Sequence, residues 1–217
     1  RGQVSLQKAA SSALLAWSLA SPAALASYGG FSVEDLPPQS QKVLVSNAQR
    51  LVFAVDAYVF DLAEDLEDTT KWADVLGQLQ SSSDARFVSV SRIERDVISP
   101  LRSLSQGLPE DAGGADIDEA VNGLVVSMAK LRMILSGNTI TVFDAAGANG
   151  SAVSPAVKKE ALDLWEDGRN SLNRGIDVVN ALADGSEVKP IGKVPSIAET
   201  KGLKRNRERY MSYKRDA

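Results

Sequence analysis

The chain has 217 residues, with 24 Lys and Arg against 28 Asp and Glu, and it contains neither Cys nor His. The lack of Cys excludes disulfides, thiolate metal sites and cysteine nucleophiles, and the lack of His removes the commonest general base and transition-metal ligand. Residues 187–217 hold nine basic and four acidic residues, a net charge of +5, whereas the remainder holds 15 basic and 24 acidic residues, a net charge of −9. An acidic body with a basic tail favours docking over substrate turnover, and a pI near 5.0 argues against nucleic acid as the main partner.

The first predicted element is an uncharged N-terminal stretch, residues 9–33. A basic residue precedes it, its centre is apolar, and it closes on the small-x-small pattern of Ala24, Leu25 and Ala26. This order is typical of an export signal, so residues 1–26 are predicted to be a signal cut after Ala26. If it is kept, the stretch is long enough to cross a bilayer as a helix, which needs about 20 residues.

Residues 27–40 are predicted to be an extended lead-in, because Pro37 and Pro38 disfavour helix in the residue before each of them. The first helix is predicted from apolar residues that recur at spacings of three and four, which places them on one face. That face consists of Leu44, Ala48, Leu51, Val55, Tyr58, Leu62 and Leu66. Beyond Leu66 the helix either continues through residues 72–79 or breaks near residues 68–70, and the serines at 81–83 end it.

A second helix is predicted to begin at Asp84, whose carboxylate can accept hydrogen bonds from exposed backbone N–H groups. Its apolar face consists of Phe87, Val90, Ile93, Val97, Leu101 and Leu104. Pro100 is expected to kink or divide this helix, because proline cannot donate the backbone hydrogen bond. Residues 107–114, which are rich in Gly, are predicted to form the next loop.

The third helix is predicted to open with a capping box at Asp116 and Glu119. Its apolar residues repeat at heptad spacing, which places one seam against neighbouring helices. That seam consists of Ile117, Val121, Leu124, Met128, Leu131 and Leu135. Gly137 and Asn138 are predicted to end the helix. Residues 139–143 alternate like a short strand, and residues 145–151 resemble a loop.

The fourth helix is predicted to start at Ser154 and Pro155, a cap followed by proline at the first helical position, and to stop at residues 184–185. Gly168 and Gly175, seven residues apart on its inner face, would let another helix approach closely. Four helices joined mostly by short loops predict an all-α fold in which residues 41–185 form an antiparallel four-helix bundle.

Two acidic clusters are candidates for chemistry. Asp61, Glu64, Asp65, Glu67 and Asp68 crowd five carboxylates into eight residues. Oxygen ligands suit calcium or magnesium, but the spacing lacks the glycine turn of a calcium loop, so a solvated face or a docking surface for basic residues is favoured. A second cluster beside Trp165 consists of Asp163, Glu166 and Asp167. Paired glycosidase acids must face each other across a cleft, which neighbouring helix residues do not do, so a polar face is favoured.

Residues 186–217 are predicted to be an extended basic arm that docks onto an acidic protein surface or anionic lipid; the alternative is an exposed terminus. Tyr and Arg are enriched where interfaces form. The candidate docking residues are Lys201, Lys204, Arg205, Arg207, Arg209, Tyr210, Tyr213, Lys214 and Arg215. The sequence gives no candidate catalytic, cofactor-binding or metal-binding residue, and we expect neither enzymatic activity, nor a cofactor, nor a small-molecule substrate, nor a nucleic-acid partner.

The leader ending in Ala24, Leu25 and Ala26, the lead-in with Pro37 and Pro38, and four amphipathic helices form a layout that resembles the PsbQ-like extrinsic proteins of photosystem II. The basic tail after Gly185 departs from the compact members of that family. The resemblance implies a non-catalytic subunit in the thylakoid lumen of a plastid, peripheral to the membrane or singly anchored in it. Such a subunit stabilises the oxygen-evolving region by contacts with the photosystem core, other extrinsic subunits and the membrane surface.

Two alternatives remain open at this point. If residues 9–27 stay in the chain as a membrane helix, the protein could be a membrane-anchored linker of photosystem I or of its light-harvesting antenna. An exported helical enzyme that uses carboxylates is the other alternative.

Overall fold

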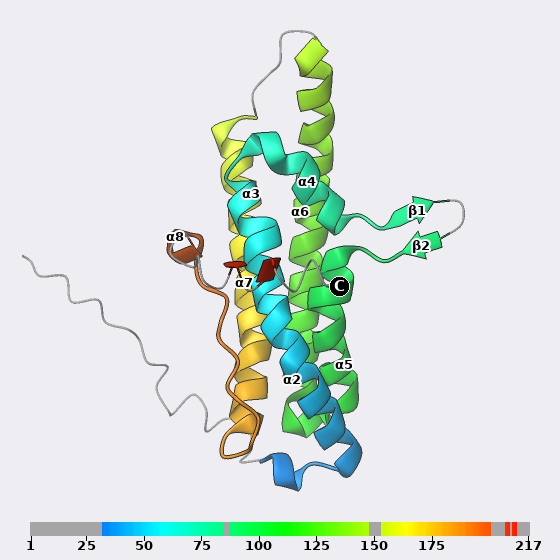
Figure 1. Cartoon of the computed structure of the whole chain (residues 1–217), viewed down its shortest axis with the longest axis vertical. Coiled ribbons are helices and arrows are strands. Elements are labelled where there is room, and N and C mark those ends of the chain that lie inside the picture. Colours follow the sequence, from blue (N-terminus) through cyan, green and yellow to red (C-terminus); the bar gives the residue numbers. More distant parts are fainter. Residues whose placement is uncertain (1–31, 85–86, 148–152, 201–206, 209, 212–217) are drawn as a thin grey trace, which may run out of the picture.

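A computed structural model describes residues 32–84, 87–147, 153–200, 207–208 and 210–211. The predicted signal or anchor at residues 1–26 therefore lies outside the described residues. The described part is all-helical except for one hairpin of two three-residue strands, which confirms the all-α prediction. The long helices lie side by side, and the hairpin projects away from them (Figure 1).

The lead-in that was predicted to be extended contains a 3₁₀-helical turn, Val33–Asp35, and the first long helix begins earlier than predicted. Helix α2 spans Pro38–Tyr58, because Pro38 occupies a first-turn position where its missing N–H costs no hydrogen bond. A π-helical turn, Val59–Ala63, and α3, Glu64–Leu66, continue the same helix. The helix then breaks at Asp68, whose carboxylate accepts from the Thr70 amide at 3.0 Å, and α4 follows at Trp72–Leu79. Of the two alternatives left open by the sequence, the structure thus shows the break near residues 68–70.

The start predicted for the second helix at Asp84 is wrong. Asp84 ends strand β1, Ser82–Asp84, which pairs antiparallel with β2, Phe87–Ser89. Phe87 and Val90 consequently do not belong to the helix. The actual helix spans residues 92–107, and its cap is the Ser91 hydroxyl, which accepts from the Glu94 amide at 3.2 Å.

Pro100 was expected to kink or divide this helix, and it does not divide it. A π-helical turn, Glu94–Ile98, leads directly into α5, Ser99–Gly107, with Pro100 in its first turn. Pro100 thus lies just after the π-helical turn, where the regular i→i−4 hydrogen-bond pattern is already interrupted, and this accommodates its missing N–H. The segment Glu110–Gly114 that follows is a kinked turn and not a regular helix, because Ala112 and Gly113 have non-helical backbone angles and Gly113 has a φ of 93°.

Helix α6, Ala115–Gly147, is longer than predicted. It begins before Asp116, so this carboxylate lies inside the first turn instead of capping the helix. Gly137 and Asn138 do not end it, because the Asn138 side chain donates to the Ile134 carbonyl within the helix at 2.8 Å. Residues 139–143 are helical and not a strand, since lengthening a helix adds one backbone bond per residue whereas a lone strand gains none. Residues 145–147 of the predicted loop are helical instead, and residues 148–151 lie outside the described residues.

Helix α7, Pro155–Ala183, starts as predicted. The Ser154 hydroxyl accepts from the Val157 amide at 3.3 Å, and Pro155 is the first helical residue. The two glycines on its inner face permit close packing, because a Cβ added at Gly168 would lie 2.2 Å from the Tyr58 hydroxyl. The close approach predicted for this face is confirmed.

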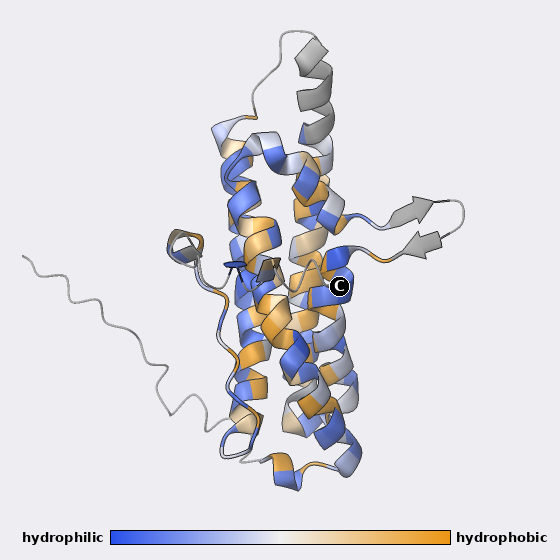
Figure 2. Ribbon diagram, in the orientation of Figure 1, coloured by the Kyte–Doolittle hydropathy of each residue, from blue (hydrophilic) through white to orange (hydrophobic). Residues whose placement is uncertain are grey.

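The core lies between the long helices, where α6 packs against α7, α5 and α4, and α2 packs against α5. Along these helices hydrophobic and hydrophilic residues alternate around the axis (Figure 2). Leu124 and Leu131 are fully buried and Met128 is 5% exposed, as predicted. The Tyr58 hydroxyl donates to the Trp165 carbonyl at 2.8 Å, and the Trp165 indole donates to the Tyr58 carbonyl at 3.3 Å. This reciprocal pair fixes α7 against α2.

Candidate docking surface

The chain after α7 turns back and lies along the same helix. The turn follows Ala183 and passes through Gly185, whose φ of 76° is in the left-handed region. Residues 187–196 are extended and lead into a short helix, α8, Ile197–Thr200 (Figure 1). We call residues 187–200 the C-terminal strap. Its apolar side chains Ile191 and Val194 are 4% and 1% exposed, so they belong to the core.

Two asparagines of α7 hold the strap through its backbone. The Ile191 amide donates to Asn180 Oδ1 at 2.8 Å, and Asn180 Nδ2 donates to the Ile191 carbonyl at 2.9 Å. Asn173 contacts Val194 in the same way, at 2.7 and 3.0 Å. A side-chain amide carries one acceptor and a donor group, so each asparagine satisfies both backbone groups of one strap residue. The spacing of seven places both amides on one face of α7.

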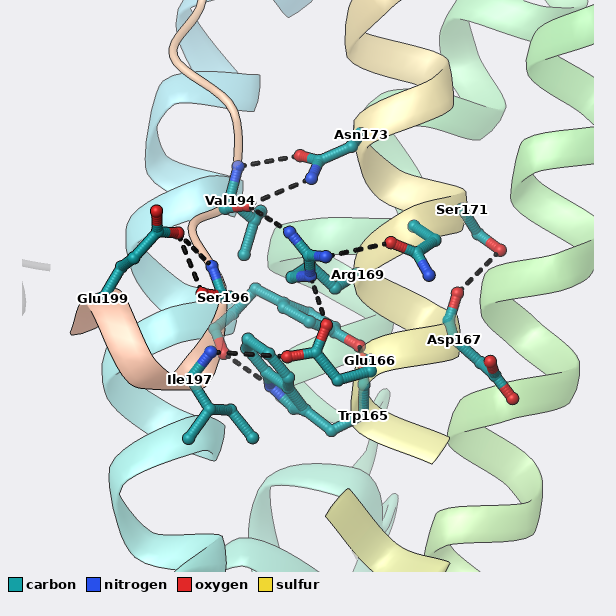
Figure 3. Close-up of polar contacts among 12 residues, drawn as sticks. Trp165, Glu166, Asp167, Arg169, Ser171, Asn173, Val194, Ser196, Ile197 and Glu199 are labelled. Carbon is teal, nitrogen blue, oxygen red and sulfur yellow. Dashed lines mark hydrogen bonds and ion pairs between the residues drawn. The ribbon is translucent and has the colours of Figure 1, made fainter. Parts of the chain in front are cut away.

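The strap ends at an ion pair on the same face. Arg169 Nε pairs with Glu166 Oε2 at 2.6 Å, and the Arg169 guanidinium also donates to the Val194 carbonyl at 3.3 Å (Figure 3). The other Glu166 oxygen accepts from the Ile197 amide at 3.3 Å. At the start of α8, the Glu199 carboxylate accepts hydrogen bonds from the hydroxyl and the amide of Ser196, both at 2.9 Å. Glu166 is therefore an anchor of the strap.

The remaining two members of that acidic cluster lie apart from the anchor. Asp163 pairs with Lys159 one turn away, and both side chains are exposed. Asp167 is exposed and its carbonyl accepts from Ser171. The three acids do not face one another across a cleft, in agreement with the polar-face interpretation.

The acidic cluster of the first helix meets the end of the C-terminal arm. The Tyr210 hydroxyl donates to the Asp61 carboxylate, and the Tyr210 ring lies 5.8 Å from the Phe60 ring, centroid to centroid. Arg207 pairs with Glu64 at 3.2 Å. Asp61 also lies 3.4 Å from the Arg92 guanidinium, and it is 7% exposed. We call this contact the arm clasp.

Burial sets the electrostatics of the arm clasp. Desolvation, followed by the hydrogen bond to Asp61, raises the pKa of Tyr210 well above its usual range. The phenol therefore stays protonated and keeps donating to the carboxylate. Because the clasp lies on the π-helical turn Val59–Ala63, the additional residue of that turn alters which side chains face the arm.

Of the other acidic residues of this cluster, Asp65 and Asp68 have local partners for their carboxylates, and Glu67 is contacted through its backbone. Asp65 pairs with Lys71 at 2.7 Å, and Asp68 caps the turn before α4. The Glu67 carbonyl accepts from Lys158 of α7. In the part of the chain that the structure describes, no group of three or more acidic side chains is arranged to hold a metal ion.

Of the nine predicted docking residues, the structure places Arg207 and Tyr210, both against the chain's own acidic cluster. The remaining seven lie outside the described residues: Lys201, Lys204, Arg205, Arg209, Tyr213, Lys214 and Arg215. The strap anchors Asn173, Asn180 and Arg169 were missed by the sequence analysis. The spacing of Asn173 and Asn180, seven residues apart beside the apolar face of α7, was the sequence pattern that could have revealed them.

Two stretches, Pro38–Leu66 and Glu110–Asn138, are long and apolar enough to cross a membrane by length and composition alone, and core helices pass the same test.

No protein-family model, curated protein or solved structure matches the chain. The site therefore makes binding contacts. It holds the extended C-terminal strap through backbone hydrogen bonds, and it joins the basic, aromatic arm to the acidic turn of the first helix.

Proposed function

We propose that the chain is a non-catalytic docking subunit, and specifically an extrinsic subunit of photosystem II on the lumenal side of the thylakoid membrane. Its body would be an antiparallel four-helix bundle formed by α2, α5, α6 and α7. It would stabilise the oxygen-evolving region by contacts with the photosystem core and other extrinsic subunits. The basic C-terminal arm would supply one of those contacts.

The observation that carries this proposal is the anchoring of the C-terminal strap. Asn173 and Asn180 each bind a strap residue through its N–H and its C=O, and Tyr210 closes the arm clasp on Asp61. An arm held at two places on a rigid body loses less conformational entropy on binding than a free tail does. The basic residues Lys189, Lys193 and Arg207, which belong to the held segments, are therefore kept beside the body, which suits a docking element.

The assignment to photosystem II is supported by sequence layout. The export-type leader that ends at Ala26 agrees with delivery to the lumen. A body with net charge −9 and a tail with net charge +5 favour electrostatic attachment to a larger assembly. The helical body after a proline-containing lead-in agrees with the PsbQ-like layout.

The proposal is tested by gentle detergent fractionation of thylakoid membranes from the source organism. The chain is expected to migrate with photosystem II and to have Ser27 as its mature N-terminus. Moderate salt should release it, since attraction between exposed charges is screened beyond about 8 Å at physiological ionic strength. Migration with photosystem I and an intact residue 9–27 segment would instead support the membrane-anchored linker. Migration with neither complex would refute both.

A further inference from the structure

The outer face of α6 carries apolar side chains that the core does not use. Val126 and Met133 are 51% and 72% exposed, while Leu124 and Leu131 on the inner face are fully buried. Because Val126 and Met133 are seven residues apart, they lie on one side of the helix. Ala129 and Gly137 lie near the same side and are also exposed. This side of α6 thus presents a narrow apolar seam to the solvent.

The seam borders a groove. A hollow of about 250 Å³ lies between Val125 and Ala129 of α6 and the apolar side chains of Leu79 and Ile93. A second hollow of about 390 Å³ lies beside Met133, Gly137 and Gln80. Arg132 lines both hollows, so they adjoin. At 1.5 Å per residue, the stretch of α6 from Val125 to Gly137 is about 18 Å long. We call it the α6 groove.

The α6 side of the groove carries positive charge, opposite in sign to the net charge of the body. Residues 120–143 contain no acidic residue, and their only charged residues are Lys130 and Arg132. Both side chains are exposed, and among the described residues neither has a carboxylate partner. Other cations of the same body are paired, for instance Arg102 with Glu94 and Arg174 with Glu119. Glu94 also lines the groove, and it is paired with Arg102. The groove therefore combines an apolar seam with two exposed cations, Lys130 and Arg132, that have no carboxylate partner among the described residues.

We propose that the α6 groove docks an amphipathic helix of a partner protein, with apolar residues on its inner side and acidic residues on its flank. The apolar side would cover Val126 and Met133, and the small residues Ala129 and Gly137 would permit close approach of the two helices. The acidic flank would pair with Lys130 and Arg132. This inference rests on the proposed docking role, and it adds a contact surface that does not involve the C-terminal arm.

Two other occupants fit the groove less well. A second copy of this chain, related by two-fold symmetry, would bring the same cations to both sides of the contact, where they repel. A bilayer surface is flat on this scale and would not fill hollows walled by Leu79 and Ile93. A separate helix avoids both difficulties.

The experiment uses the purified full chain and a labelled synthetic 18-residue peptide that is helical, with leucines at heptad spacing and glutamates on both flanks. A second peptide has lysines in place of the glutamates. Fluorescence anisotropy should show binding of the glutamate peptide, weakened about tenfold or more by Arg132→Glu and also by Met133→Asp. The lysine peptide should bind the wild type less tightly than it binds Arg132→Glu. The matched control, Lys42→Glu, reverses an exposed charge on α2 and should leave binding unchanged.

Equal binding of the two peptides, or no effect of Arg132→Glu, would overturn the inference. It would also be overturned if vesicles with anionic lipid bound through Arg132 while the peptide did not, or if Met133→Asp abolished self-association in sedimentation velocity. Circular dichroism must show unchanged helix content in each variant. The result is separable from the proposed function, because fractionation of the wild-type chain with photosystem II is read without any of these variants.

Discussion

Replacing Gly168 by Ala tests the packing between α7 and α2 at its closest point. The added methyl group would lie 2.2 Å from the Tyr58 hydroxyl, 2.8 Å from the Met128 methyl group and 3.4 Å from a Leu124 methyl group. None of the three can retreat into solvent, because Tyr58 and Leu124 are fully buried and Met128 is 5% exposed. The tyrosine hydroxyl must therefore move, and its 2.8 Å bond to the Trp165 carbonyl is lost or lengthened.

The magnitude follows from three contributions to the free energy of unfolding. Overpacking a filled core costs about 1–3 kcal/mol. Leaving the buried hydroxyl or the carbonyl without its hydrogen bond costs about 1–3 kcal/mol more. Alanine favours the helix over glycine by about 1 kcal/mol, which offsets part of this loss. We expect Gly168→Ala to lower the free energy of unfolding by about 1–5 kcal/mol.

The assay is urea unfolding followed by circular dichroism, with Gly77→Ala as the matched control. Gly77 lies inside α4, is exposed, and has no atom within 4 Å of the position an added Cβ would take. This control should raise the free energy of unfolding by up to about 1 kcal/mol, because only helix propensity changes. The two substitutions should thus act in opposite directions. A Gly168→Ala variant as stable as the wild type would show that α7 and α2 are not in close contact there.

Three further substitutions test the core, the strap and the arm clasp. Leu124→Ala should cost about 2–5 kcal/mol in urea unfolding, whereas the exposed Val126→Ala should cost less than about 0.5 kcal/mol; equal effects would mean that the inner face of α6 is misassigned. Asn180→Ala should speed amide exchange at Ile191 about tenfold, since a lost hydrogen bond of about 1.4 kcal/mol corresponds to that factor, and unchanged exchange would refute the anchoring. Tyr210→Phe should cost about 1–3 kcal/mol at neutral pH. Because the folded pKa of Tyr210 is raised above 10, its contribution is complete below pH 10 and is lost as the pH rises beyond that, so the difference between wild type and variant should shrink in alkaline urea titrations and should not grow.

The sequence predicted the parts of the fold that depend on local and periodic patterns. The apolar seam that includes Leu124 and Leu131 is buried, and Ser154 and Pro155 begin α7, because burial and capping act within a few residues. Helix ends were predicted less well where one segment can adopt two alternative structures. Gly137 and Asn138 resemble a stop, yet α6 continues through them, and Asp84 resembles a cap but pairs in a hairpin. The neighbouring residues do not distinguish a helix end from a continuing helix at Gly137, or a helix cap from a hairpin at Asp84.

The sequence predicted which charged segments form the candidate docking surface, but not which residues contact each other. The positive charge of the arm and the acidity of the first helix are visible in the sequence, but the contact between Tyr210 and Asp61 spans 149 positions. No periodic pattern predicts such a pairing. The π-helical turn Val59–Ala63 also has no clear sequence pattern, although it decides which carboxylates face the arm. Asn173 and Asn180 are polar residues on a helix, and their role depends on a strap whose path the sequence does not reveal.

The central claim, a subunit that docks on photosystem II through its basic arm, is tested most directly by a rebinding measurement. Photosystem II from the source organism, stripped of extrinsic proteins by salt, is titrated with the purified mature chain and with a chain that lacks residues 204–217. We expect saturable rebinding of the full chain and at least about tenfold weaker rebinding of the truncated chain, with the helix content of α2, α5, α6 and α7 unchanged. Equal rebinding of the two chains, or no saturable rebinding of the full chain, would contradict it.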